Sequence, residues 1–106
     1  GDLPEAPGQL PWHYSPEKKI VINNTPPIIH KRCGYLFFSN IPDDYPADMS
    51  VVLSADGDLR EAAANLFAHL HTLDSMDIDI IYAQPVPREN LGAAIMDRLE
   101  KASKKI

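Results

Sequence analysis

The sequence predicts a small α/β domain with a mostly parallel sheet of three to four strands and two main helices. Two patterns predict this class. After residue 49, short apolar runs alternate with longer stretches whose apolar residues recur every three or four positions, as strands and helices do around a parallel sheet. Eight of the ten prolines lie in residues 1–46, whereas both long helical patterns lie after residue 57. Proline fixes φ and lacks an N–H, so the prolines at 4, 7, 11 and 16 exclude a helix from residues 1–17.

Four apolar runs are the candidate strands. They are nearly continuous, which is typical of strands covered on both faces. About ten residues with two prolines separate the first two runs, too few for a crossover helix. One helical layer is therefore expected to be thin or absent, and the first strand is left open as an antiparallel edge. The four runs are residues 19–23, 34–39, 49–54 and 78–83.

The clearest helix is predicted to begin at Asp58, which forms an acidic capping box with Glu61 three residues later. Such a cap stabilises a helix by about 1 kcal/mol. Asp56-Gly57-Asp58 reads as a turn leading into this cap and not as a calcium loop. One apolar stripe then follows the helix at Leu59, Ala63, Leu66, Leu70 and Leu73.

A second helix is predicted over about residues 90–104. Lysines gather at its C-terminus, where the helix dipole favours cations. Gly92, near its start, is expected to permit close backbone packing. The predicted inner face consists of Leu91, Ile95, Leu99 and Ala102.

Composition narrows the classes of partner. A length of 106 residues fits one domain, and the net charge of −5 gives no overall attraction for phosphate backbones, so direct nucleic-acid binding is not expected. No apolar run approaches the roughly 18 residues that a membrane span needs. The single cysteine, Cys33, suits a reducing compartment, and we expect a cytoplasmic protein. The start at Gly1 has no signal-peptide pattern, and the chain could be a piece of a longer one.

Residues 1–17 are predicted to be an extended, proline-rich linker, and residues 18–106 the folded domain. Within the linker, Ala6-Pro7-Gly8-Gln9-Leu10-Pro11-Trp12-His13-Tyr14-Ser15-Pro16 resembles the Pro-Gly-Met-x-x-x-His-Tyr-(Ala/Ser)-Pro segment of long-form threonylcarbamoyl-AMP synthases. Residues 59–103 resemble the end of the C-terminal domain of the same enzymes.

The resemblance implies a Rossmann-like accessory domain that partners a catalytic YrdC-type domain in the same parent chain. That catalytic domain would condense threonine, bicarbonate and ATP, with Mg, into threonylcarbamoyl-adenylate for tRNA modification. The fragment itself would hold no cofactor and no catalytic residue. The linker would close over the catalytic cleft, and the residues that match its motif are Pro7, Gly8, His13, Tyr14 and Pro16.

The linker departs from the family pattern at three positions. Gln9 stands where Met is usual, and Pro11-Trp12 replaces Tyr followed by a basic residue, which puts a phosphate contact from that residue in doubt. His13 and Tyr14 remain the best functional candidates, since a lid of that kind excludes water and orders a substrate. The alternative is a linker that has no role at the cleft and only packs on its own domain.

Other candidates are weaker. Asp97-Arg98 is expected to be structural, and Leu91-Gly92 lacks the glycine-rich loop of a nucleotide site. His69 and His71 point in different directions on a helix, so no metal site is expected. Two functions compete with the accessory domain: a stand-alone interaction or oligomerisation module, and a small nucleotide binder.

Overall fold

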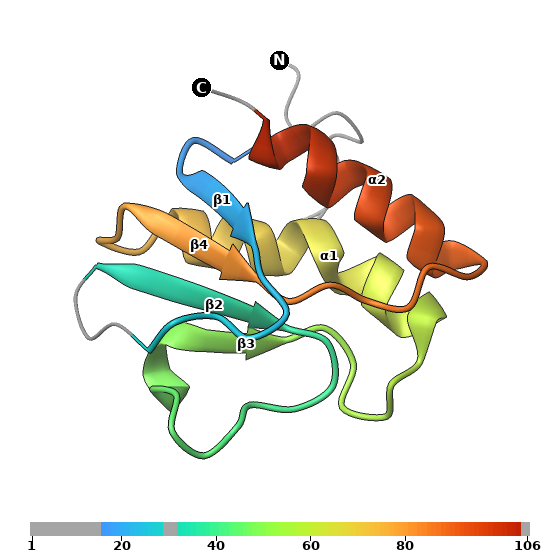
Figure 1. Cartoon of the computed structure of the whole chain (residues 1–106), viewed down its shortest axis with the longest axis horizontal. Helices are drawn as coiled ribbons and strands as arrows, with labels where there is room; N and C mark the ends of the chain where they lie inside the picture. Colours follow the sequence, from blue (N-terminus) through green and yellow to red (C-terminus); the bar gives the residue numbers. More distant parts are fainter. Residues whose placement is uncertain (1–15, 29–31, 105–106) are drawn as a thin grey trace.

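A four-stranded, all-parallel sheet forms the centre of the protein (Figure 1). The computed structural model describes residues 16–28 and 32–104. Across these ranges the strand order is β1-β4-β2-β3, and the prediction of an α/β fold with a mostly parallel sheet is confirmed. The elements are β1 (Lys19–Ile22), β2 (Cys33–Phe37), the 3-10 turn η1 (Ala47–Met49), β3 (Ser50–Val52), α1 (Leu59–Asp74), β4 (Ile80–Ala83) and α2 (Leu91–Ser103).

The first strand is an edge strand, but it is parallel. β1 pairs with β4 from Lys19↔Ile80 to Ile22↔Ala83, so the antiparallel alternative is wrong. β4, the last strand in the chain, also pairs with β2 and therefore lies between the two earlier strands. This insertion gives β1 a parallel partner without a helix between β1 and β2.

One face of the sheet is covered by both helices. Strand residues with even numbers on β1 and β2 point to this face, together with Ile81 and Leu53. Leu36 and Ile81 are fully buried there. Burying an aliphatic side chain of this size contributes roughly 1.5–3 kcal/mol, which makes this layer the main core. The helices add Ala62, Leu66, Leu70, Leu73, Ile95, Met96 and Leu99.

The opposite face is aromatic and is covered by loops. Tyr35 and Phe37 are buried, and the ring of Tyr45 meets both edge-on, with centroid distances of 5.1 and 4.9 Å. The hydroxyl of Tyr35 donates to the carbonyl of Pro27 at 3.0 Å, and that of Tyr45 donates to the carbonyl of Pro26.

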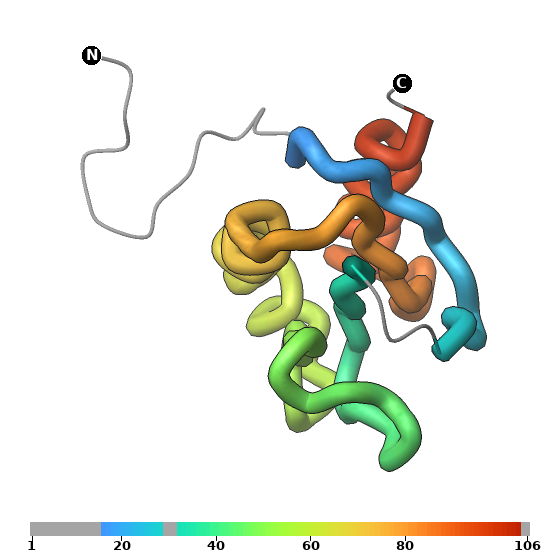
Figure 2. Tube along the Cα trace, turned by 90° about the vertical axis from the view of Figure 1, so that its left-hand side faces the viewer, coloured from blue at the N-terminus to red at the C-terminus, as the bar shows by residue number. Residues whose placement is uncertain are grey.

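Figure 1 shows the two layers on opposite faces of the sheet: α1 lies behind it, and the segment after β1 crosses in front of it. Figure 2 shows the connection after β2, in green, at the opposite end of the molecule from α2. In the described ranges neither connection contains an α-helix. The expectation of a thin layer on one side is therefore confirmed.

The N-terminus of α1 has the predicted Asp58 cap, and the hydroxyl of Ser54 takes part in it as well. The Asp58 carboxylate accepts hydrogen bonds from the backbone N–H groups of Arg60 (2.9 Å) and Glu61 (3.4 Å). The Glu61 carboxylate does not return to Asp58 directly. It accepts from the hydroxyl of Ser54 at 2.5 Å, and that hydroxyl accepts from the Asp58 N–H at 2.9 Å. Gly57, at φ +71°, makes the turn that brings Ser54 under the helix.

The predicted inner face of α2 is partly wrong. Leu91 is 42% exposed, while Gly92 and Met96 are buried beside Ile95 and Leu99. The helix is rotated because its start must pass close to the preceding loop. A Cβ at Gly92 would lie 1.7 Å from the carbonyl oxygen of Pro87, so close backbone packing at this glycine is confirmed.

Candidate functional site

Four of the five predicted linker residues, Pro7, Gly8, His13 and Tyr14, lie outside the described residues. Their roles stay predictions, as does the division of the chain after residue 17. Pro16, the fifth, is described and buried. It lies where the N-terminal segment joins the domain, so the geometry of this junction decides where that segment begins.

The junction is held by Asp74, the last residue of α1. Its carboxylate accepts hydrogen bonds from the backbone N–H groups of Glu17 (3.1 Å to each oxygen) and Lys18 (2.9 Å). The Lys18 ammonium donates to the Asp74 carbonyl at 2.7 Å, which satisfies a backbone group that the helix end leaves open. Charge-assisted bonds of this kind are stronger than neutral ones, so the N-terminal segment enters the domain at a fixed point.

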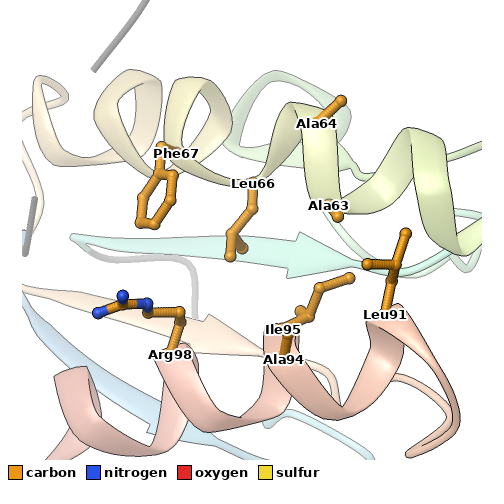
Figure 3. A pocket seen from close by; sticks show the side chains of 8 residues that line it. All are labelled: Ala63, Ala64, Leu66, Phe67, Leu91, Ala94, Ile95 and Arg98. Carbon is orange, nitrogen blue, oxygen red and sulfur yellow. The ribbon is translucent and has the colours of Figure 1, made fainter. Parts of the chain in front are cut away.

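An apolar groove runs between α1 and α2 on the surface (Figure 3). Its cavity volume is about 300 Å³. Phe67 and Arg98 lie at one end, and Ala63 and Leu91 lie at the other. Alanines along both helices leave the space open, while the buried Gly92 lets the helix starts approach. The lining residues are Ala63, Ala64, Leu66, Phe67, Leu91, Ala94, Ile95 and Arg98.

The described lining of the groove suits an apolar ligand group. Among the residues that the structure describes, it is built from alanine, leucine, isoleucine and phenylalanine side chains, with Arg98 as the one charged member. An apolar or aromatic group can fill such a groove, and a guanidinium at its end can lie over an aromatic ring.

The side chains of Asp97 and Arg98 have different surroundings in the structure. Asp97 pairs with Lys101 one turn later at 3.2 Å, an exposed i,i+4 ion pair that contributes a few tenths of a kcal/mol. The prediction of a structural role is therefore confirmed for Asp97. Arg98, one residue on, lines the groove.

The strongest charge cluster is an exposed one around Arg32. Its guanidinium donates to Asp79 (2.7 and 3.0 Å) and to Asp77 (3.0 Å), and this lowers the pKa of Asp79 below its ordinary value. Burial raises the pKa of the neighbouring Cys33 thiol, and the negative charge of Asp79 adds to the shift. An inert thiol beside a surface ion pair indicates packing, not reactivity.

Residues 16–28 and 32–104 contain neither a metal-binding cluster nor a membrane-spanning helix. No group of three or more His, Cys, Asp or Glu side chains in that part of the chain could hold a metal ion. No helix there is long and apolar enough to cross a membrane.

Sequence reasoning missed the Asp74 junction and the groove. The junction joins residues 56 and 57 positions apart, and no local pattern signals it. The groove had a signal in principle, since small residues at Ala63, Ala64 and Ala94 with an apolar Leu91 mark an incompletely filled helix pair. Reading that signal requires knowing which face of α2 points to the core, and the periodicity wrongly placed Leu91 on the inner face.

Comparisons with known proteins agree with this fold. A family model described as "Threonylcarbamoyl-AMP synthase, C-terminal domain" matches residues 1–104. Proteins named threonylcarbamoyl-AMP synthase from Pyrococcus abyssi and Bacillus subtilis are each 31% identical over 96% of this chain. The one from Schizosaccharomyces pombe is 30% identical over 95%.

A solved structure shows the same architecture. The crystal structure of P. abyssi Sua5 complexed with L-threonine superposes with a TM-score of 0.66 and 27% identity over 97% of this chain. The chain spans about a third of the length of these relatives, 33%, 30% and 33% of the three sequences and 33% of the solved chain. The family model covers nearly every residue, and so the chain belongs to the family of threonylcarbamoyl-AMP synthase C-terminal domains.

Proposed function

We propose that this domain is the accessory part of a threonylcarbamoyl-AMP synthase and acts on a catalytic YrdC-type domain in the same polypeptide. One observation carries the proposal: a match over 96% of this chain takes up only a third of the P. abyssi and B. subtilis enzymes. The remaining two thirds of such an enzyme would supply the chemistry. This function belongs to tRNA threonylcarbamoyladenosine modification, and we expect it in the cytoplasm.

The division of labour follows from the residues present. The catalytic domain would condense threonine, bicarbonate and ATP, with Mg bound alongside the nucleotide. The described lining of the groove is apolar with one guanidinium, which suits a domain that binds and positions. The relative of known structure was crystallised with L-threonine, which fits a threonine-using parent enzyme.

The linker, residues 1–17, would connect the two activities. It resembles the segment that closes the catalytic cleft in this family, with His13 and Tyr14 as the groups that reach the nucleotide. The Asp74 junction supports this role, because a fixed exit point limits where the preceding residues can go. A segment anchored at one end loses less entropy when it closes over a substrate.

Kinetics of the full-length enzyme test the proposal. His13→Ala combined with Tyr14→Phe should raise the KM for ATP or lower kcat by about tenfold or more, since the loss of even one hydrogen bond to a charged group costs roughly 1.5–3 kcal/mol. Gln9→Ala, a change in the same segment at a position that departs from the motif, should leave both constants unchanged. Unchanged ATP turnover and affinity in the double variant would refute the lid.

The groove favours a second candidate, a stand-alone interaction or oligomerisation module. An exposed apolar groove with Leu91 42% exposed is a surface that a protein partner could cover. Reading the gene upstream of Gly1 separates the two. A preceding α/β domain rich in Lys, Arg and Ser supports the accessory role, and a start codon directly before Gly1 supports the module.

A further inference from the structure

We propose that the groove between α1 and α2 binds the chain's own residues 10–12, with the Trp12 ring at the Phe67–Arg98 end, so that His13 and Tyr14 stay available for the lid role of the proposed function. This intramolecular contact goes beyond the proposed function, because it needs neither ATP nor a catalytic domain. It would give the linker a second attachment point, in addition to the Asp74 junction.

The first argument is reach. The described chain begins at the Asp74 end of α1, and Phe67 lies seven residues earlier on the same helix, about 10 Å along its axis. Trp12 precedes Glu17 by five residues, which can span up to about 17 Å when extended. Pro11 and Pro16 favour such extension. The Phe67–Arg98 end of the groove is therefore the part that this segment meets first (Figure 3).

The second argument is chemical complementarity. Residues 10–12 are Leu10, Pro11 and Trp12, and none of them is charged. The described lining of the groove is apolar apart from Arg98. A Trp ring is the best partner for a guanidinium over its face, so the one charged lining residue finds a favourable contact with this occupant. Trp12 stands where the family usually has a basic residue, which Arg98 would repel.

Other occupants fit the groove less well. A second copy or another domain would have to approach a groove whose near end already receives the chain through the Asp74 junction. The tethered segment has a high effective concentration and needs no partner.

Trp12 is the single tryptophan of the chain, so its fluorescence reports the contact directly. In the 106-residue chain without ligand, we expect a blue-shifted emission and acrylamide quenching well below that of the urea-unfolded chain. Ala94→Glu places a carboxylate in the groove lining and should raise quenching to the unfolded level. Arg98→Met should raise it partway, through loss of the cation–π contact.

Matched controls separate the groove from general damage. Ala93→Glu, on the neighbouring exposed position outside the lining, should leave quenching unchanged. Ala64→Glu repeats the test from α1, with the exposed Ala68→Glu as its control. Far-UV circular dichroism and urea midpoints check that all five variants fold, as expected because the four alanine positions are exposed and Arg98 is half-buried.

Three results would overturn the proposal. The first is a Trp12 as accessible in the native chain as in urea. The second is equal quenching in Ala94→Glu and Ala93→Glu. The third is protection that appears only with self-association, which would assign the groove to a second copy. Because no ATP or catalytic domain enters, failure here leaves the His13 and Tyr14 kinetics of the proposed function untouched.

Discussion

The two faces of the sheet differ in what covers them. The helix-covered face buries aliphatic residues such as Leu36 and Ile81 beneath α1 and α2, whereas the aromatic face buries Tyr35 and Phe37 beneath loops. The helices hold their own backbone hydrogen bonds, while the loops are attached through two tyrosine hydroxyls and ring edges. Elements with few internal bonds open first, so we expect the domain to be rigid around the groove and junction and to open locally on the aromatic face.

The largest expected effect breaks the helix-covered side. Gly92→Ala should destabilise the protein by about 3–4 kcal/mol, because the new Cβ would lie 1.7 Å from the Pro87 carbonyl oxygen and backbone must move. A domain of this size has about 5–10 kcal/mol in total, so the loss should be plain in urea unfolding. Gly34→Ala is the matched control. Its Cβ would come close to the ends of the Ile78 and Leu73 side chains, at 2.9 and 3.0 Å, while the Met49 carbonyl oxygen lies at an ordinary 3.7 Å, and about 1 kcal/mol is expected.

On the aromatic face, Tyr45→Ala should cost about 2 kcal/mol through two lost ring contacts and one hydrogen bond. More specifically, it should expose this face while α1 stays folded. Cys33, the single cysteine, is buried in the same cluster and reports the opening by its rate of alkylation. Labelling should accelerate in Tyr45→Ala, with amide exchange in α1 unchanged. Equal acceleration of both would show that the faces open together.

Ser54→Ala sharpens the account of the α1 cap. The buried hydroxyl accepts from the Asp58 N–H and donates to Glu61, so its removal breaks both part-buried hydrogen bonds and should cost about 1–2 kcal/mol in urea unfolding. Ser75→Ala, at the exposed end of the helix, should change stability by less than about 0.5 kcal/mol. A Ser54 variant as stable as the Ser75 variant would contradict the three-member cap.

The smallest effect concerns the exposed ion pairs of Arg32. The folded-state pKa of Asp79 lies below the ordinary value for aspartate of about 4. The ion pair therefore stabilises the folded state fully above about pH 4, and this contribution is lost as the pH falls through the folded-state pKa. Arg32→Ala should remove this part of the acid-side decline in urea midpoints between about pH 5 and pH 2. An acid-side profile identical to that of the parent protein would assign no role to the pair.

Local chemistry explains what the sequence could predict. The Asp58 cap and the stripe of Leu66, Leu70 and Leu73 depend on neighbours within a helical turn or two, and both are confirmed. Parallel strands and the thin layer followed from run lengths and prolines. These features are encoded within short windows.

The features that sequence reasoning missed depend on distant partners. Insertion of β4 beside β1 needs the tertiary fold, as does the rotation of α2 that exposes Leu91 and buries Met96. The Asp74 carboxylate gives no sign in the sequence that it holds Glu17. Residues 1–15, which carry the predicted lid, lie outside the described residues, and their role stays a proposal.

The central claim is that this domain works with a catalytic domain through its N-terminal segment. The most direct measurement is threonylcarbamoyl-adenylate formation by the full-length polypeptide, compared with the same polypeptide ended before Gly1 and with the His13→Ala, Tyr14→Phe variant. We predict that both changes lower the rate at limiting ATP by about tenfold or more. Equal rates in all three proteins would contradict the claim.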